Sequence, residues 1–206
     1  SSAASDVYKR QLNYRWELLS GKAWDFSLKY KKWSFPLFFQ KDEIRCAQFL
    51  TLNWNSQKVL VVNLHLHAKP DSEGGQSRRL DEVAYLLELI EDEEFDVAVL
   101  AGDFNSTPNS AVLDLFRKAG FVGGENSDMN SYAPSRNSVS QRVAQLESES
   151  MPDCTELFED RRLDYILVKN GAPEKIQIEE KLVFDESTPS LSDHYAMSAE
   201  LQFANL

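Results

Sequence analysis

Residues 58–66 alternate between apolar and other side chains, a pattern that predicts a strand with one face in the core. That apolar face is formed by Leu60, Val62, Leu64 and Leu66. The opposite face begins with Val59 and Val61 and ends with Asn63, His65 and His67. Because this second face turns polar toward its carboxyl end, we expect the strand to pass from the core into a polar site. Residues 45–53 predict a partner strand, joined through the turn-like residues 54–57.

The rest of the chain predicts two helices and four more strands. Apolar residues at helical spacing predict a helix over 77–90, and the apolar run 95–102 predicts a strand buried on both faces. Thr107 and Pro108 predict the N-cap and first turn of a second helix over about 109–118, which Gly120 would end. Further strands are expected over 163–168, 176–184 and 195–203. This order favours an α/β fold in which sheets lie inside and helices outside.

The remaining stretches predict irregular structure within a single domain over residues 12–206. Residues 1–11 are polar and lack an apolar stretch, so we interpret them as a tail or truncation scar and not as a signal peptide. Residues 12–40 are rich in aromatic side chains at irregular spacing and predict short strands and loops. Residues 121–160 are rich in Ser, Asn, Asp and Glu, which indicates a long surface excursion and a candidate substrate loop.

Composition narrows the class of protein. The chain has 206 residues, of which 42% are hydrophobic, enough for one well-cored domain. Its formal net charge of −11 is opposite to that of most domains that grip duplex nucleic acid, which makes nucleic acid a less favoured partner without excluding it. Cys46 and Cys154 are far apart and lack metal-ligand spacing. No apolar run reaches the roughly 18 residues of a membrane span, and compartment and oligomeric state stay open.

Four polar motifs lie at the ends of apolar runs and contain every histidine of the chain. They are Asn63-Leu64-His65-Leu66-His67-Ala68, Gly102-Asp103-Phe104-Asn105, Arg162-Leu163-Asp164-Tyr165-Ile166 and Leu191-Ser192-Asp193-His194. Hydrolysis of a phosphodiester needs a base for water, balance for the phosphoryl charge and help for the leaving oxygen. A histidine held by a carboxylate suits the first task, and carboxylates hold Mg²⁺ or Mn²⁺. The motifs therefore indicate a metal-assisted phosphodiesterase site.

In this order the motifs resemble the endonuclease/exonuclease/phosphatase superfamily, which includes exonuclease III-type nucleases, DNase I-like enzymes and neutral sphingomyelinases. The resemblance covers about residues 45–203 and implies a DNase I-like α/β sandwich of mixed β-sheets. It further implies Mg²⁺ (or Mn²⁺) as the cofactor. Two features depart from the family pattern. Leu64 stands where the family has Thr, and the family's N-terminal Asn and Gln-Glu pair are not visible. Glu17 follows Trp16 and not Gln, so it is left unassigned, and we expect the fold to be N-terminally incomplete.

The resemblance also implies a role for each motif residue. His194 would be the general base on water, Asp164 would orient it, and Asp193 would be a metal ligand. Asp103 and Asn105 would position the nucleophile and the phosphate. His65 would stabilise phosphoryl oxygens or assist the leaving group. His67, next along the chain, is the feature closest to the neutral sphingomyelinases.

Each of these residues also has a plain structural interpretation. A single histidine at a strand end is more often a hydrogen-bonded structural residue, and this alternative carries equal weight for His67. Asp103 and Asn105 are residue types that favour turns, and Asp164 could pair with Arg161 or Arg162 on the surface. Asn63 is better interpreted as support behind the site than as part of it. For the remaining motif residues, their co-occurrence favours a site.

Three functional hypotheses follow. The first is a phosphodiesterase acting on a phospholipid headgroup or another small phosphodiester, favoured by the net charge and by His67. The second keeps the chemistry but makes the substrate nucleic acid, as in a DNA-repair or RNA-processing nuclease. The third is an inactive, truncated domain that binds a phosphate compound or a protein partner.

Overall fold

A computed structural model of the chain describes residues 47–54, 57–71, 74–126, 128–171, 176–183 and 192–203. The larger sheet contains β1 (Ala47–Trp54), β2 (Gln57–His65), β3 (Val97–Asp103) and β4 (Asp164–Asn170), in that order. The smaller sheet contains β5 (Ile176–Val183) and β6 (Ala196–Phe203). The helices are α2 (Gly75–Glu91), α3 (Ala111–Lys118), α4 (Ser138–Ser148) and the 3-10 turn η2 (Thr155–Phe158). Predictions for residues 1–46, including the tail, lie outside the described residues.

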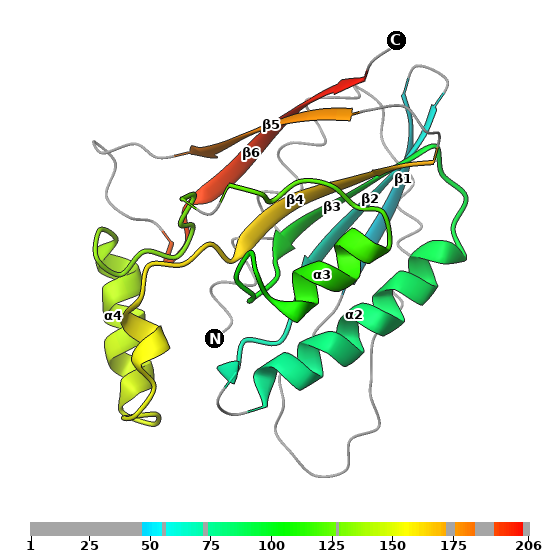
Figure 1. Cartoon of the computed structure of the whole chain (residues 1–206). Coiled ribbons are helices and arrows are strands. Elements are labelled where there is room, and N and C mark those ends of the chain that lie inside the picture. The colour runs from blue at the N-terminus through cyan, green and yellow to red at the C-terminus, as the bar shows by residue number, and fades with distance from the viewer. Residues whose placement is uncertain are drawn as a thin grey trace.

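The two sheets and the helices form layers. Figure 1 shows α2 and α3 along one face of the larger sheet and the β5–β6 sheet on its other side. Helices outside and sheets together inside confirm the predicted α/β sandwich. None of the described helices is long and apolar enough to cross a membrane.

The topology of the larger sheet brings three of the four motifs to one edge. β2 and β3 are parallel, so both end at this edge, and β4 is antiparallel to β3, so it begins there. In register, His65 of β2 is the partner of Asp103 of β3, and Asp103 is the partner of Asp164 of β4. Three polar residues from distant parts of the sequence therefore lie in a row across neighbouring strands.

The core lies between the larger sheet and its helices. The apolar face predicted for residues 58–66 is confirmed, because Leu60, Val62, Leu64 and Leu66 are all buried. They belong to one hydrophobic cluster with side chains of α2 and α3 such as Leu86 and Phe116. Burial of each large aliphatic or aromatic side chain stabilises the fold by roughly 1.5–3 kcal/mol, which holds the sheet edge rigidly enough to carry a site.

The start of α3 differs from its prediction. Ser110, not Thr107, is the N-cap: its side-chain oxygen accepts the backbone N–H of Leu113 at 3.3 Å, and the helix begins at Ala111. Thr107 instead closes a turn, since its carbonyl accepts the N–H of Ser110. The end of the helix is as expected, because Gly120 adopts the left-handed conformation, φ 89°, that follows a helix terminus.

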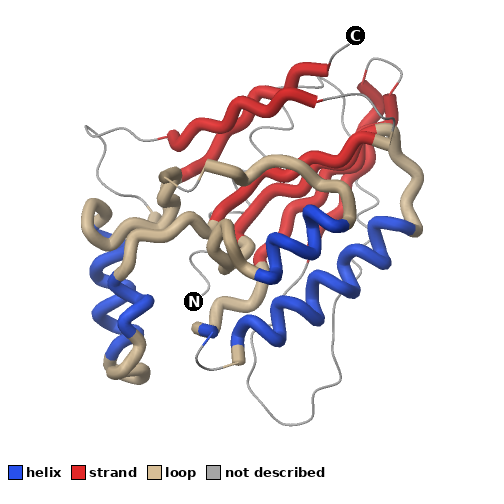
Figure 2. The backbone as a smooth tube through the Cα atoms, in the orientation of Figure 1, coloured by secondary structure: helices blue, strands red, loops and turns tan. Residues whose placement is uncertain are grey.

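Residues 121–160 were predicted as a surface excursion, and this prediction is wrong for much of the segment. The segment contains α4 and η2, and its residues Ser131, Tyr132 and Asn137 are buried. Figure 2 shows the loop between α3 and α4 running along β4, where Val122 bridges to Val168. Its Ser and Asn side chains serve as helix caps and buried hydrogen-bond partners, which composition alone does not distinguish from solvated loop residues.

Candidate active site

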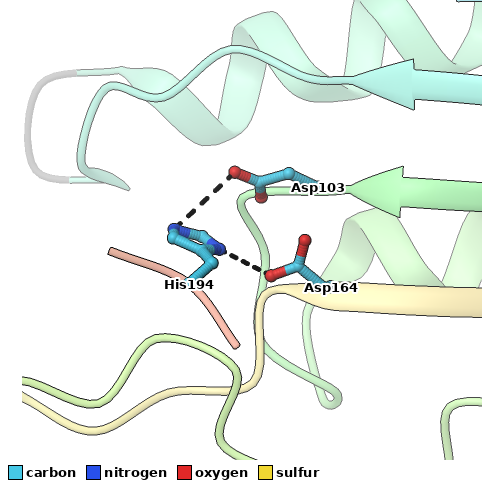
Figure 3. A group of neighbouring side chains, drawn as sticks. All are labelled: Asp103, Asp164 and His194. Atoms are coloured by element: carbon cyan, nitrogen blue, oxygen red, sulfur yellow. Dashed lines mark hydrogen bonds and ion pairs between the residues drawn. The ribbon is translucent and has the colours of Figure 1, made fainter. Parts of the chain in front are cut away.

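The four motifs meet at the edge of the larger sheet. Asp103 and Asp164 are neighbours across β3 and β4, and His194 reaches them from the segment just before β6. Figure 3 shows the three side chains pointing toward one another, with His194 facing both carboxylates. The sequence prediction that these motifs converge is therefore matched by the structure.

His194 lies between two carboxylates. Its Nδ1 is 2.6 Å from Oδ2 of Asp164, a short hydrogen bond in which the ring N–H donates to the carboxylate. Its Nε2 is 4.0 Å from Oδ2 of Asp103. His65 approaches the same Asp103 oxygen, with its Nε2 at 3.4 Å. Asp103 thus stands between two imidazoles, one of which is oriented by a second carboxylate.

The two arginines that were the alternative partners of Asp164 pair elsewhere. Arg161 lies near Glu156, and the buried Arg162 pairs with Glu180 of β5 at 2.5 Å. Asp164 instead binds His194, and it is itself buried. The interpretation of Asp164 as half of a surface ion pair is therefore wrong.

The turn after β3 aims Asp103. A Cβ on Gly102 would come within 2.0 Å of the carbonyl oxygen of Leu64, so only glycine allows β2 and β3 to approach here. The extended conformation of β3 ends at Asp103, and Asn105 adopts a left-handed φ of 47°. Its backbone N–H donates to Oδ1 of Asp103 at 2.8 Å, and its amide donates to the carbonyl of Leu66 at 3.0 Å. The turn interpretation of this pair is correct, and the turn also orients the carboxylate.

A cavity of about 590 Å³ opens in front of these side chains. From the predicted site it is lined by His65, Asp103, Asn105, Asp193 and His194. Asp164 is absent from the lining; it is buried and bound to His194. Glu147 of α4, with Glu156 and Glu159 in and after η2, adds carboxylates to the wall. The side chain of His65 is 47% exposed and is accessible from this space.

Three residues of the motifs lie apart from the close group of Asp103, Asp164 and His194. Asp193 lines the cavity, but it lies outside the close group formed by Asp103, Asp164 and His194. His67 is buried and is not part of the cavity lining. Asn63 donates to Oε1 of Gln48 on β1 at 3.3 Å, so it ties two strands together and does not support His65.

Arg79, which sequence reasoning missed, shapes one side of the cavity. This buried guanidinium donates to the carbonyls of His67 at 2.9 Å and Lys69 at 2.7 Å, and it also pairs with Asp71. It thereby folds the segment that follows His65. In sequence it stands among the charged residues of an amphipathic helix, so no local signal distinguishes it.

The charge state of His194 follows from its surroundings. Burial disfavours the charged imidazole, but the charge and hydrogen bond of Asp164, followed by the charges of Asp103 and Asp193, raise the pKa of His194 to about 9. The imidazole of the metal-free chain is therefore protonated at neutral pH.

This pKa predicts a pH-dependent stability. The folded chain holds the His194 proton up to about pH 9, whereas an unfolded histidine loses it near pH 6.5. The stabilising contribution is therefore full below about pH 6.5 and is lost as the pH rises through about 9. The free energy of unfolding can be measured with urea, without divalent ions, for the unsubstituted protein and for Asp164→Asn. The difference between the two proteins should shrink as the pH rises from about 6.5 to about 9. An equal difference at pH 6 and pH 9 would contradict the assigned cause.

Comparison with known proteins places the chain in a family. The Endonuclease/Exonuclease/phosphatase family matches residues 26–194, which include all four motifs. The chain belongs to this family. A curated relative, the CCR4-Not complex 3'-5'-exoribonuclease subunit Ccr4 of Candida albicans, is 33% identical over 114 residues, 50% of this chain and 14% of that protein.

Solved structures share the family fold at low identity. Beta toxin from Staphylococcus aureus superposes with a TM-score of 0.55 at 15% identity, over 76% of this chain and 57% of that one. TDP2 of D. rerio, complexed with a single-strand DNA product, superposes with a TM-score of 0.56 at 15% identity, over 77% of this chain and 62% of that one. Sphingomyelinase C from Streptomyces griseocarneus superposes with a TM-score of 0.54 at 19% identity, over 76% of this chain and 57% of that one. The chain spans about six-tenths of these structures.

The residues present fit the metal dependence of this family. Asp103, Asp164 and His194 each offer a ligand atom, and these atoms lie within 4.8 Å of one another. Asp164 already accepts the imidazole N–H, which makes Asp103 the carboxylate more available to an ion. Carboxylate oxygens suit hard cations such as Mg²⁺ and Mn²⁺, and Asp193 adds another carboxylate to the same cavity. A related structure, beta toxin of Staphylococcus aureus, was determined with bound magnesium ions.

Proposed function

We propose that this protein is a divalent-metal-dependent phosphodiesterase in which His194 activates water and Asp164 orients His194. The observation that carries this proposal is the row His65, Asp103, Asp164 on adjacent strands with His194 bound against it. A base, its orienting carboxylate and a second carboxylate at one sheet edge are the groups that phosphodiester hydrolysis requires.

Within this reaction, each side chain has a task set by its contacts. Asp164 engages Nδ1 of His194, so Nε2 is the nitrogen that takes the proton from water. A divalent ion, when bound, balances the phosphoryl charge and lowers the pKa of water. Asp103 and Asp193 are the residues we propose to hold it. An ion held by these carboxylates would offset part of the negative charge that raises the pKa of His194, and the imidazole could then act as a base.

His65 and Asn105 complete the proposed machinery. His65 is exposed to the cavity and contacts Asp103, so it is placed to stabilise phosphoryl oxygens or to assist the leaving group. Asn105 uses one amide hydrogen on Leu66 and keeps a second for a phosphoryl oxygen or the attacking water.

The role of Asp193 as a metal ligand can be measured without activity. Replacing Asp193 by asparagine removes one negative charge from the cavity and should weaken Mg²⁺ binding about 10- to 100-fold in a calorimetric titration. The control is Asp114→Asn, which removes a carboxylate paired with Arg117 on the surface of α3 and should leave the affinity unchanged. Equal affinities of Asp193→Asn and the unsubstituted chain would exclude Asp193 as a ligand.

A small phosphodiester, such as a phospholipid headgroup, is the substrate class we favour. Acidic side chains outnumber lysine and arginine side chains in the cavity lining, which disfavours a polyanion, and the net charge of −11 adds to this. A zwitterionic headgroup carries one phosphate with a compensating positive charge and avoids that cost. The cavity volume of about 590 Å³ also lies in the range of small-molecule sites.

A nuclease is the second candidate, favoured by the 33% identity to the exoribonuclease subunit Ccr4. Parallel assays on sphingomyelin, abasic duplex DNA and single-stranded RNA, each with and without Mg²⁺, separate the candidates. Metal-dependent release of the sphingomyelin headgroup without nuclease activity is the expected result. Nuclease activity alone would favour the second candidate. Intact folding without Mg²⁺ binding or any hydrolysis would favour an inactive phosphate- or partner-binding domain.

A further inference from the structure

We infer that residues 131–140 position His194 against Asp164, and that Ser131 is the residue through which both are held. This inference rests on the proposed function, because it assigns positioning residues to that reaction. Each residue from Ser192 to Tyr195 is contacted by a side chain or backbone group of this segment. The segment lies within the stretch that the sequence predicted to be a surface excursion.

Ser131 links the two partners of the short hydrogen bond. Its hydroxyl oxygen accepts the backbone N–H of Asp164 at 3.0 Å and that of Leu163 at 3.1 Å. Its backbone carbonyl accepts the N–H of Tyr195 at 2.8 Å. Ser131 has no exposed surface, so water cannot replace these contacts. One residue therefore sets the spacing between the start of β4 and the residue that follows His194.

Tyr132 controls the orientation of the imidazole. It bridges Arg161 on one side and His194 on the other through backbone pairing. Its ring centroid lies 5.5 Å from that of the His194 ring at an interplanar angle of 58°. Its hydroxyl donates to the carbonyl of Leu157 in η2 at 2.9 Å, which anchors the far end of the ring. The imidazole is therefore packed on one face while Asp164 holds its Nδ1.

The first turn of α4 holds the backbone that precedes His194. The amide nitrogen of Asn137 donates to the carbonyl of Ser192 at 2.9 Å, while its Oδ1 caps the helix by accepting the N–H of Val139 and of Ser140. The hydroxyl of Ser140 donates to the carbonyl of Asp193. Both side chains are buried, where a polar group costs free energy unless it is hydrogen-bonded. These hydrogen bonds therefore fix the path of the chain into the site.

The variant Ser131→Ala tests this inference. It leaves the N–H groups of Leu163 and Asp164 without their acceptor, so the start of β4 is free to shift away from His194. Because small misplacements of a catalytic group cost up to about 100-fold, kcat should fall about 10- to 100-fold while KM stays within about threefold. The downfield N–H proton resonance of His194, which reports its hydrogen bond to Asp164, should weaken or disappear.

Ser106→Ala is the matched control for this measurement. Ser106 is also a buried serine near the end of β3, but its hydroxyl oxygen has no hydrogen-bond partner in the part of the chain that the structure describes. Ser106→Ala should therefore keep the His194 resonance, and the melting temperatures of the two variants report any general cost of removing a buried hydroxyl. If Ser131→Ala keeps both the resonance and the turnover, the inference is wrong.

A second variant covers the case in which Ser131→Ala fails to fold. Asn137→Asp keeps the oxygen that caps α4 but replaces the donor to Ser192 by an oxygen, so the helix stays while the hold on the preceding backbone is lost. It should weaken the His194 resonance and reduce kcat about tenfold. An unchanged resonance in a folded Asn137→Asp would overturn the inference. The resonance can be measured without a substrate. If the unsubstituted protein hydrolyses no phosphodiester but the variants still lose the resonance, the positioning role is supported and the proposed function is refuted.

Discussion

Replacing His194 by alanine should lower phosphodiester turnover at least about 1,000-fold in the protein that remains folded. His194 is the imidazole that combines a carboxylate partner at 2.6 Å with a nitrogen facing the second carboxylate. The substitution removes the imidazole that accepts the proton from water and that Asp164 orients. The loss should appear in kcat measured at saturating substrate and Mg²⁺.

The matched control for this variant is His67→Asn. His67 is buried next to the site but outside the cavity lining, so its replacement tests a histidine of the same neighbourhood. We expect a change in the melting temperature and less than about tenfold change in turnover of the folded protein. Turnover near that of the unsubstituted protein in His194→Ala would show that the proposed base is misassigned.

Replacing Asp103 by asparagine should also lower turnover about 1,000-fold. The asparagine keeps an oxygen to accept the N–H of Asn105, so the turn after β3 is retained while the negative charge is lost. That charge stands between His65 and His194 and is the centre of the proposed metal site. Mg²⁺ affinity measured by calorimetry should fall together with kcat, which a change in the base alone would not produce.

Asp96→Asn provides the control for the Asp103 variant, because Asp96 precedes β3 at the opposite end of the same strand. Its carboxylate accepts the N–H of Lys58 and has no part in the cavity lining. This variant should keep Mg²⁺ affinity and turnover. If Asp103→Asn binds Mg²⁺ as tightly as the unsubstituted protein, the metal is held elsewhere and the assignment of Asp103 fails.

The elements with strong periodic patterns could be predicted from the sequence. The buried face of β2 and the strand over 97–103 were recognised because apolar spacing is a local property of the chain. The expected helix over 77–90 is α2, which spans 75–91. The cap of α3 was misplaced by three residues, since Thr107 and Ser110 are both good caps and Thr107 instead closes a turn by accepting the N–H of Ser110.

For the site, the sequence identified the residues, and only the structure gave their geometry. The motifs identified His65, Asp103, Asp164 and His194 as a group, because apolar strands rarely end in such side chains unless these converge on a charged ligand. Their distances and their environment were not readable from the motifs. The strand register aligns His65, Asp103 and Asp164, and the negative surroundings of His194 raise its pKa against the opposing effect of burial.

What the sequence by itself determined is the class of fold, the family and the residues proposed to carry the chemistry, since these depend on local periodicity and on short motifs. The tertiary structure alone decided which residues hold those groups in place. Ser131 and Asn137 hold the site through contacts with residues 32 to 64 positions away in the chain, and Arg79 through contacts 8 to 12 positions away. Such contacts arise only when distant segments pack, so a polar side chain in a polar stretch has no local feature that separates a buried support from a solvated residue.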